Sequence, residues 1–333
     1  MTKIKIRRVP FGDARFDADA RARIMNIVES GRNTEHKYVK EFEDKFASRF
    51  GYKHAVMTSS GTTAGEVLWM AVAETRGLAS RRPGVVLTPA LAFAATANCI
   101  IRAGLKPGFQ DIEPHLNMAV PAVNYRSSDT IGIQFVLNMG RTIGIAAMRE
   151  YARNNDLFFA VDACEGHGAM WAGKDISKWA DAATYSFYPA HIMTCAGEGG
   201  MIATNSKRLA DLCRSIKSHG RPSGQITHDF QRVGTNSKST EFAAAVGLSA
   251  LDEFNRSFVR RTANTERLLD ELGDLPVELF PPAKCELIGP HAFPVIVQEG
   301  AGFTRDKIVD YLEKNGVETR TLFSSMPTQC ADG

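Results

Sequence analysis

The sequence predicts an α/β protein with a mainly parallel sheet, followed by a smaller α+β C-terminal domain. Over the first two thirds of its 333 residues, short apolar segments of strand length alternate with segments of helical periodicity. This alternation is typical of parallel strands joined by helices that cover both faces of the sheet. After about Gly220 the alternation stops, and a long helical stretch leads to a few short strands. We therefore predict a large domain, residues 1–235, and a small domain, residues 236–333.

Two helices are expected before the first strand. The first covers residues 18–30, with Asp17 as its N-cap and Gly31 as the residue that ends it. The second covers residues 37–50 and ends at Gly51. The apolar residues Ile24, Ile27 and Val28 of the first helix recur on one face.

The alternating part follows in chain order. We expect its strands at residues 54–58, 84–89, 106–112, 130–136, 157–163, 183–189 and 199–205. We expect its helices at residues 64–74, 93–104, 141–155 and 206–220, the last of them capped by Ser206.

The C-terminal part has fewer strands and longer helices. A helical stretch, unbroken or broken once, is expected over residues 239–272. Further along the chain we expect strands at 277–280, 291–298 and 317–323, and a helix at 304–316. These elements would form the small α+β domain, which the long helices join to the large one.

The composition excludes several classes of partner. Hydrophobic residues make up 44% of the chain and charged residues 23%, and the net charge is +3, so we expect neither nucleic acid nor a membrane surface as partner. No apolar run reaches the roughly 18 residues that span a bilayer, and the N-terminus lacks the apolar core of a signal peptide. We expect a cytoplasmic protein. The six cysteines form no CxxC pair, so neither a zinc site nor a redox dithiol is expected.

Polar residues follow several expected strands at their C-terminal ends, where open α/β sheets bind ligands. The segment SSGTT, residues 59–63, could bind an anion at a helix N-terminus or simply form a turn. Phe93 could stack on a flat ring or pack in the core. Asp162 ends an apolar strand and needs a partner, such as a protonated ring nitrogen, an Arg or a helix cap. Glu165 could lie at the rim of such a site, and His167 is expected to be a hydrogen-bonded structural residue.

Two further segments carry polar residues at the same edge. The sequence SFYPAH places Ser186 and His191 after a strand, where the imidazole serves either catalysis or the packing of a turn. The sequence GTNSKSTE places Asn236 and Lys238 in a polar loop before a helix, where the loop could also be only a helix cap.

Together and in this order, these segments resemble the DegT/DnrJ/EryC1/StrS family of sugar aminotransferases. The resemblance covers essentially the whole chain. It implies the aspartate-aminotransferase-like fold (fold type I) and a homodimer with shared sites. It also implies pyridoxal 5′-phosphate (PLP) or its amine form, pyridoxamine 5′-phosphate (PMP), as the cofactor.

The resemblance implies a set of contacts to this cofactor. They are Gly61, Thr62 and Ser186 for the phosphate, Phe93 for the ring face, Asp162 for the ring nitrogen, Glu165 for the ring hydroxyl, and Asn236 for the phosphate in the neighbouring subunit. At the position of Glu165 the family more often has Gln. A carboxylate beside the ring nitrogen keeps that nitrogen protonated, so that the ring can take up electrons.

The departure that matters most concerns the lysine that binds the cofactor covalently. The family's aminotransferases read Ser-Phe-x-x-x-Lys, and here His191 occupies the lysine position. An imidazole forms no stable covalent link of that kind, but it can transfer a proton near neutral pH. The sequences SFYPAHIMTCAGEGG and NSKSTE resemble those of the sugar 3-dehydratase branch. These enzymes use PMP to remove the C3 hydroxyl of a nucleotide-activated 4-keto-6-deoxyhexose, so the resemblance implies His191 as the acid/base.

The 3-dehydratase branch includes enzymes with and without a [2Fe–2S] cluster. The segment where the cluster cysteines would lie, residues 219–236, contains no cysteine, so no iron–sulfur cluster is expected. The chain thus resembles the cluster-free GDP-4-keto-6-deoxymannose 3-dehydratases, which regenerate PMP from glutamate. The chain departs from the pattern of this branch at two places. At Ile192 the branch often has a second His, and the family's chains continue beyond the end of this sequence. The small domain is therefore expected to be truncated.

Two alternatives stay open at this point. The first is a PLP-dependent sugar-nucleotide aminotransferase that tolerates His191 or uses another lysine, such as Lys238. The second is a non-catalytic cofactor-binding regulator or decayed paralogue. The sequence leaves the nucleotide and the stereochemistry of the sugar open.

Overall fold

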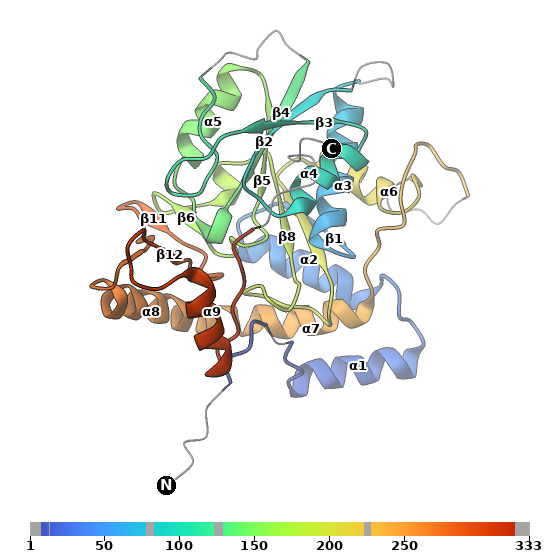
Figure 1. Ribbon diagram of the computed structural model, residues 1–333. Coiled ribbons are helices and arrows are strands. Elements are labelled where there is room, and N and C mark those ends of the chain that lie inside the picture. Colours follow the sequence, from blue (N-terminus) through green and yellow to red (C-terminus); the bar gives the residue numbers. More distant parts are fainter. Residues whose placement is uncertain (1–7, 13, 78–82, 123–128, 223–227, 324–333) are drawn as a thin grey trace.

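The computed structural model describes residues 8–12, 14–77, 83–122, 129–222 and 228–323. A seven-stranded sheet with the order β1-β9-β8-β5-β4-β2-β3 forms its centre (Figure 1). The strands are β1 (His54–Thr58), β2 (Val85–Pro89), β3 (Lys106–Gln110), β4 (Thr130–Val136), β5 (Phe158–Asp162), β8 (Ala182–Ser186) and β9 (Gly200–Thr204). All neighbouring pairs from β8 to β3 are parallel, and β9 is antiparallel to both β8 and β1. The predicted mainly parallel sheet is confirmed, with β9 as its one reversed strand.

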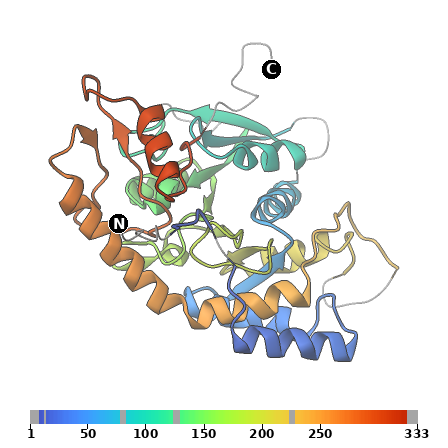
Figure 2. The same ribbon diagram turned by 60° about the horizontal axis from the view of Figure 1, so that its bottom comes forward.

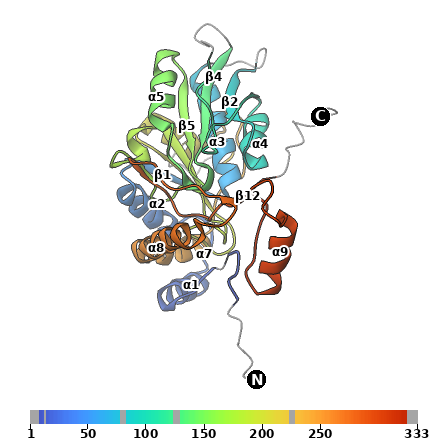
Figure 3. The same ribbon diagram turned by 60° about the vertical axis from the view of Figure 1, so that its left-hand side comes forward.

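Helices cover both faces of this sheet, as predicted. One face carries α1 (Ala18–Ser30), α2 (Lys37–Arg49), α5 (Ile145–Asn154) and α7 (Glu241–Asp252), and the other carries α3 (Gly61–Thr75), α4 (Ala94–Arg102) and α6 (Lys207–Ile216). Figure 3 shows the sheet between α2 and α5 on one side and α3 and α4 on the other. Successive side chains of a strand point to opposite faces of the sheet. Met57 of β1 packs in the apolar core on the first face, and Val56 packs in the core on the second.

The predicted caps of two helices are confirmed. In α1, Asp17 Oδ1 accepts a hydrogen bond from the amide of Ala20 at 2.7 Å, and Gly31 adopts the left-handed φ of 67° that ends the helix. In α6, Ser206 Oγ accepts from the amide of Leu209 at 3.3 Å. These contacts satisfy amides that a helix leaves free at its start.

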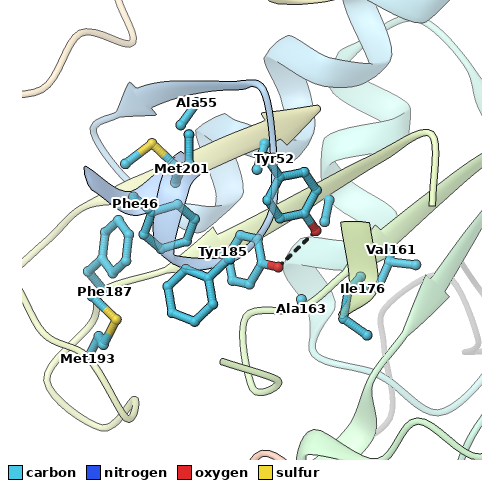
Figure 4. Close-up of a cluster of buried hydrophobic side chains, with 14 of the residues drawn as sticks. Phe46, Tyr52, Ala55, Val161, Ala163, Ile176, Tyr185, Phe187, Met193 and Met201 are labelled. Atoms are coloured by element: carbon cyan, nitrogen blue, oxygen red, sulfur yellow. Dashed lines mark hydrogen bonds between the residues drawn. The ribbon is translucent and has the colours of Figure 1, made fainter. Parts of the chain in front are cut away.

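A buried aromatic cluster lies beneath the end of β8. The ring of Phe46 in α2 lies 5.0 Å from that of Tyr185 and 5.7 Å from that of Phe187, measured between centroids. The hydroxyl groups of Tyr52 and Tyr185 share a hydrogen bond of 3.0 Å (Figure 4). The cluster therefore holds the end of β8, and the turn that follows it, from within the core.

The predicted long helical stretch is broken once. Helix α7 ends at Asp252, and α8 (Phe254–Leu272) continues nearly end to end along one border of the molecule, with α1 outside α7 (Figures 1 and 2). Beyond α8, β10 (Val277–Glu278) pairs with β12 (Ile296–Val297), and α9 (Arg305–Lys314) follows. The division of the chain at residue 235 stays a prediction. None of the helices in the described part of the chain combines the length and apolar character needed to cross a membrane.

Two features of the C-terminal part differ from the prediction. The prediction of a strand at residues 317–323 is wrong. Val317 forms a single isolated bridge with Val9, and this bridge does not extend into a strand pair. A small sheet that was not predicted consists of β6 (Met170–Trp171), β7 (Lys174–Asp175) and β11 (Glu286–Leu287). Strands of two residues are too short to produce a recognisable period in the sequence.

Candidate active site

The N-terminus of α3 lies directly after β1, at the carboxyl edge of the sheet. Ser60 caps this helix, because its Oγ accepts from the amide of Thr63 at 3.1 Å and its carbonyl accepts from the amide of Ala64 at 3.0 Å. The amides of Gly61 and Thr62 have no acceptor among the described residues. They are therefore free to bind an anion at the positive end of the helix dipole.

Ser186 lies against this end of α3. A Cβ atom on Gly61 would lie 2.7 Å from Ser186 Cβ, and one on Gly200 would lie 2.1 Å from the carbonyl oxygen of Ser60. Only glycine allows such close contacts at both positions. The three residues predicted to hold a phosphate, Gly61, Thr62 and Ser186, are thus brought together.

Asp162 lies half-buried at the end of β5. Its Oδ2 accepts from Thr96 Oγ1 at 3.1 Å, and its Oδ1 accepts from the amide of Cys164 at 3.2 Å. The amide of Thr96 in turn donates to the carbonyl of Phe93 at 2.9 Å, so Phe93 and Asp162 belong to one cluster. The side chain of Phe93 is 66% exposed, which leaves a ring face available to a planar ligand.

Glu165 lies three residues after Asp162 and is largely buried. Its Oε2 accepts from the amide of Met139 at 2.7 Å. Burial is the main cause that raises the pKa of Glu165 to about 7, and the charge of Asp162 raises it further, while the Met139 amide opposes the change. Near neutral pH this carboxyl group can therefore donate or accept a hydrogen bond.

His191 lies in the turn between β8 and β9. Its amide donates to the carbonyl of Tyr188 at 2.9 Å, and its ring Nδ1 is buried without a hydrogen-bond partner among the described residues. Burial, followed by the charge of Arg261, lowers the pKa of His191 to about 4. The imidazole is therefore neutral at pH 7, with a ring nitrogen free to accept a proton, and the lowered pKa makes it a weaker base than an exposed histidine.

Two residues that were not predicted from the sequence contact this part of the molecule. The ring centroid of His291 lies 5.0 Å from that of His191, and His291 Nε2 lies 3.6 Å from Glu165 Oε1. Arg261 of α8 donates from Nη1 to the carbonyls of Pro290 and His291, both at 3.2 Å. No motif marks either residue, because both reach the site through contacts between segments that are distant in sequence.

His167 differs from its predicted role as a hydrogen-bonded structural residue. It is fully buried, but neither ring nitrogen has a hydrogen-bond partner in the described part of the chain. Its ring centroid lies 6.3 Å from that of His191 and 5.2 Å from that of Tyr185. Across the residues that the structure describes, no three or more His, Cys, Asp and Glu side chains are arranged to hold a metal ion.

The loop before α7 lies beside the start of α3, since the amide of Ser59 donates to the carbonyl of Ser237 at 3.0 Å. Asn236 is exposed in this loop, and its Oδ1 accepts from Lys238 Nζ at 2.7 Å. The predicted site residues of this chain thus occupy one edge of the sheet, with Asn236 on the surface next to it.

The comparisons with known proteins confirm the predicted aspartate-aminotransferase-like fold. The chain belongs to the DegT/DnrJ/EryC1/StrS aminotransferase family, whose sequence model matches residues 15–331. The family predicted from the sequence is thereby confirmed.

Individual relatives carry different activities. The chain is 30% identical to dTDP-4-dehydro-2,6-dideoxy-D-glucose 3-dehydratase of Saccharopolyspora spinosa, over 94% of this chain and 74% of that protein. It is 27% identical to GDP-perosamine synthase of Vibrio cholerae, over 95% of this chain and 84% of that protein. Among solved structures, Escherichia coli GDP-4-keto-6-deoxy-D-mannose 3-dehydratase with bound hydrated PLP is 25% identical and superposes with a TM-score of 0.85, covering 98% of this chain and 88% of that one.

Proposed function

We propose that this protein is a PMP-dependent 3-dehydratase that removes the C3 hydroxyl of a nucleotide-activated 4-keto-6-deoxyhexose, with His191 as its acid/base. The broader class is a PLP-dependent sugar-nucleotide enzyme of the DegT/DnrJ/EryC1/StrS family. The observation that carries the proposal is the imidazole of His191 in the turn after β8, with its Nδ1 buried, at the position where the aminotransferase motif has lysine. An imidazole leaves the cofactor unattached but can move a proton.

The residues at the sheet edge fit the cofactor of this class. The free amides of Gly61 and Thr62, next to the Ser186 hydroxyl, suit a phosphate group. The Asp162 carboxylate suits a protonated ring nitrogen, and it is already oriented by two hydrogen bonds. The exposed ring of Phe93 suits the face of a pyridine ring.

The roles of the protein side chains follow from this arrangement. When bound, PMP supplies an amine for the keto group of the sugar and a ring that takes up electrons. His191, neutral at pH 7, would accept a proton and return it to the C3 hydroxyl, which leaves as water. Asp162 would keep the ring nitrogen protonated. Glu165, whose pKa is raised to about 7, would form a hydrogen bond with the ring hydroxyl of the cofactor.

The proposal includes glutamate as the amino donor that restores PMP, and a homodimer with shared sites. Asn236 would reach the phosphate bound by the neighbouring subunit. Two observations support this role of Asn236. The side chain is exposed, and its loop lies beside the start of α3, because the Ser237 carbonyl accepts from the amide of Ser59.

The second candidate function is a sugar-nucleotide aminotransferase, which the relation to GDP-perosamine synthase favours. It requires a lysine that binds the cofactor, such as Lys238, whose Nζ donates to Asn236 Oδ1 here. Incubation with PLP, borohydride reduction and peptide mass spectrometry separate the two candidates. An aminotransferase yields a covalent adduct on one specific lysine. The dehydratase yields none in the site, with His191→Lys as the positive control.

The direct test is turnover of a sugar nucleotide. The protein is supplied with PMP, glutamate and a GDP- or dTDP-4-keto-6-deoxyhexose, and the product is identified by mass. A dehydratase product has lost the C3 oxygen, an aminotransferase product carries an amino group in place of the ketone, and a regulator gives no product.

Replacement of the proposed acid/base should have the largest effect on this reaction. We expect His191→Asn to lower the rate of C3 deoxygenation by about 10²–10⁴-fold, which is the usual contribution of a general acid–base group. Cofactor binding, followed by absorbance, should survive, and the exposed control His228→Asn should leave the rate unchanged. An undiminished rate in His191→Asn would remove this residue from the mechanism.

A further inference from the structure

We propose that Arg15 and Arg261 form an anion site that binds the diphosphate of the nucleotide-activated substrate. This inference rests on the proposed function and adds to it the residues that recognise the nucleotide half of the substrate. It starts from Arg261, which binds the carbonyl of His291, and from Arg15, which follows the N-terminal segment that packs against the turn of His191. Neither arginine forms an ion pair with an acidic side chain among the described residues.

The first observation concerns the surroundings of Arg261. This side chain of α8 is half-buried, and its Nη1 donates to the carbonyls of Pro290 and His291. The remaining N–H groups of the guanidinium have no hydrogen-bond acceptor, and no carboxylate lies within 4.0 Å of it, in the part of the chain that the structure describes. A charge removed from water normally has such a partner, because burying it unpaired is costly.

The second observation places Arg15 next to the same region. The N-terminal segment runs against the turn that carries His191, since a Cβ on Gly12 would lie 2.6 Å from the carbonyl oxygen of Pro189. Arg15 follows three residues later, and its side chain is exposed. Burial is the main cause that lowers the pKa of Arg261, and the like charge of Arg15 lowers it further. Like charges held together in this way favour a bound anion.

The third observation links this pair to the candidate active site. One of the two carbonyls that Arg261 binds belongs to His291, whose ring centroid lies 5.0 Å from that of His191. Burial is the main cause that lowers the pKa of both histidines, and the positive charge of Arg261 contributes in each case. Because these imidazoles are neutral at pH 7, they neither add to nor offset the charge of the arginines.

The charge and shape of the pair favour a diphosphate over a single carboxylate. The diphosphate of a nucleotide sugar carries two negative charges, which match the two guanidinium groups. Guanidinium also presents a planar fork of N–H donors that binds two phosphate oxygens at once. The carboxylate of an amino donor such as glutamate has the same kind of oxygen but half the charge, so the experiment must distinguish these two sources.

Binding of GDP and dTDP, measured by calorimetry on the full chain, tests the proposal without any turnover. We expect Arg261→Gln to weaken nucleotide binding by at least about tenfold, the value of a lost charged hydrogen bond. Arg261→Lys keeps the charge but loses the fork, and should bind with intermediate affinity. Arg15→Gln should weaken binding less, because the Arg15 side chain is exposed. The matched control is Arg260→Gln, an exposed arginine one position earlier in α8, which should change affinity less than twofold.

Several outcomes would overturn the proposal. Unchanged GDP and dTDP affinity in Arg261→Gln, with wild-type C3 deoxygenation intact, refutes the diphosphate site and leaves the proposed function standing. A loss of glutamate binding with nucleotide binding retained assigns the pair to the amino donor instead. A wild-type protein that neither binds a nucleotide nor converts a sugar nucleotide refutes both proposals. Thermal unfolding of each variant confirms that it is folded before its affinity is compared.

Discussion

The central sheet and the C-terminal segment, residues 277–323, are held in place by different forces. In the sheet region, Phe135, Phe159 and Trp69 are completely buried between strands and helices. In the C-terminal segment, the buried large apolar side chains are few, namely Val277, Phe280, Ile288 and Pro290, and α9 buries none of its residues. Apolar burial thus stabilises the sheet, and it contributes less in the C-terminal segment, where one small cluster packs Phe280 against Leu116 and Met139.

A polar clamp also holds the C-terminal segment. Glu286 and Arg141 form a buried ion pair of 2.8 Å, and their side chains are 0% and 5% exposed. The same carboxylate accepts from the amides of Thr142, Ile143 and Ala283. The segment that carries His291 is thus positioned largely by a few directional hydrogen bonds and one ion pair, whereas the turn that carries His191 is positioned by a packed core.

The largest expected effect tests the packed side of this comparison. Phe46→Ala should lower the free energy of unfolding by about 3–5 kcal/mol, because it opens a cavity in the aromatic cluster beneath β8. The matched control in the C-terminal segment is Tyr311→Ala in α9, whose side chain is 66% exposed and whose loss should cost less than about 0.5 kcal/mol. Urea unfolding measures both. Equal costs would refute the contrast between the two regions.

The next effect tests the polar clamp. Glu286→Gln should make opening of residues 277–297 easier by about 3 kcal/mol, because it leaves the Arg141 guanidinium buried and unpaired. Hydrogen exchange with mass spectrometry should show faster exchange there and unchanged protection in the central strands. Glu278→Gln, which replaces an exposed carboxylate in β10, is the control. If exchange accelerated across the whole sheet, the clamp would belong to the main core.

A smaller effect concerns Glu165, where the two regions meet. Its folded pKa of about 7 lies above the ordinary 4.5, so the unfolded chain ionises first as pH rises. Its contribution to stability therefore falls between pH 4.5 and about 7. Glu165→Gln should raise the free energy of unfolding of the cofactor-free protein by about 1–3 kcal/mol at pH 8, and leave it unchanged near pH 4. Urea unfolding at both pH values measures this, with the exposed Glu299→Gln as control. A difference that is the same at both pH values would contradict the assigned ionisation.

The smallest effect is expected at the surface of α9. Lys314 and Asp310 form an exposed ion pair one turn apart. Asp310→Asn should change the free energy of unfolding by less than about 0.5 kcal/mol, and added salt should remove the difference. A cost near that of Glu286→Gln would mean that exposed and buried ion pairs contribute equally here, and it would contradict the special role of the buried clamp.

Much of the fold could be predicted because its signals are local. The strands of the sheet are apolar runs next to helices with clear caps, as at Asp17 and Ser206, and such patterns are visible within a few residues. The predicted strand at 317–323 was wrong because a strand needs a neighbour to pair with, and only Val317 finds one. The two-residue strands of the small sheet carry no period that could have revealed them.

The sequence by itself determined which side chains lie at the carboxyl edge of the sheet, because parallel strands end at one edge. Asp162 and Ser186 end their strands, and His191 follows in the turn after β8. Only the tertiary structure decided that His291 and Arg261 join them. That outcome depends on how α8 and the clamp around Glu286 fold back onto the sheet, and contacts between distant segments leave no periodic trace in the sequence.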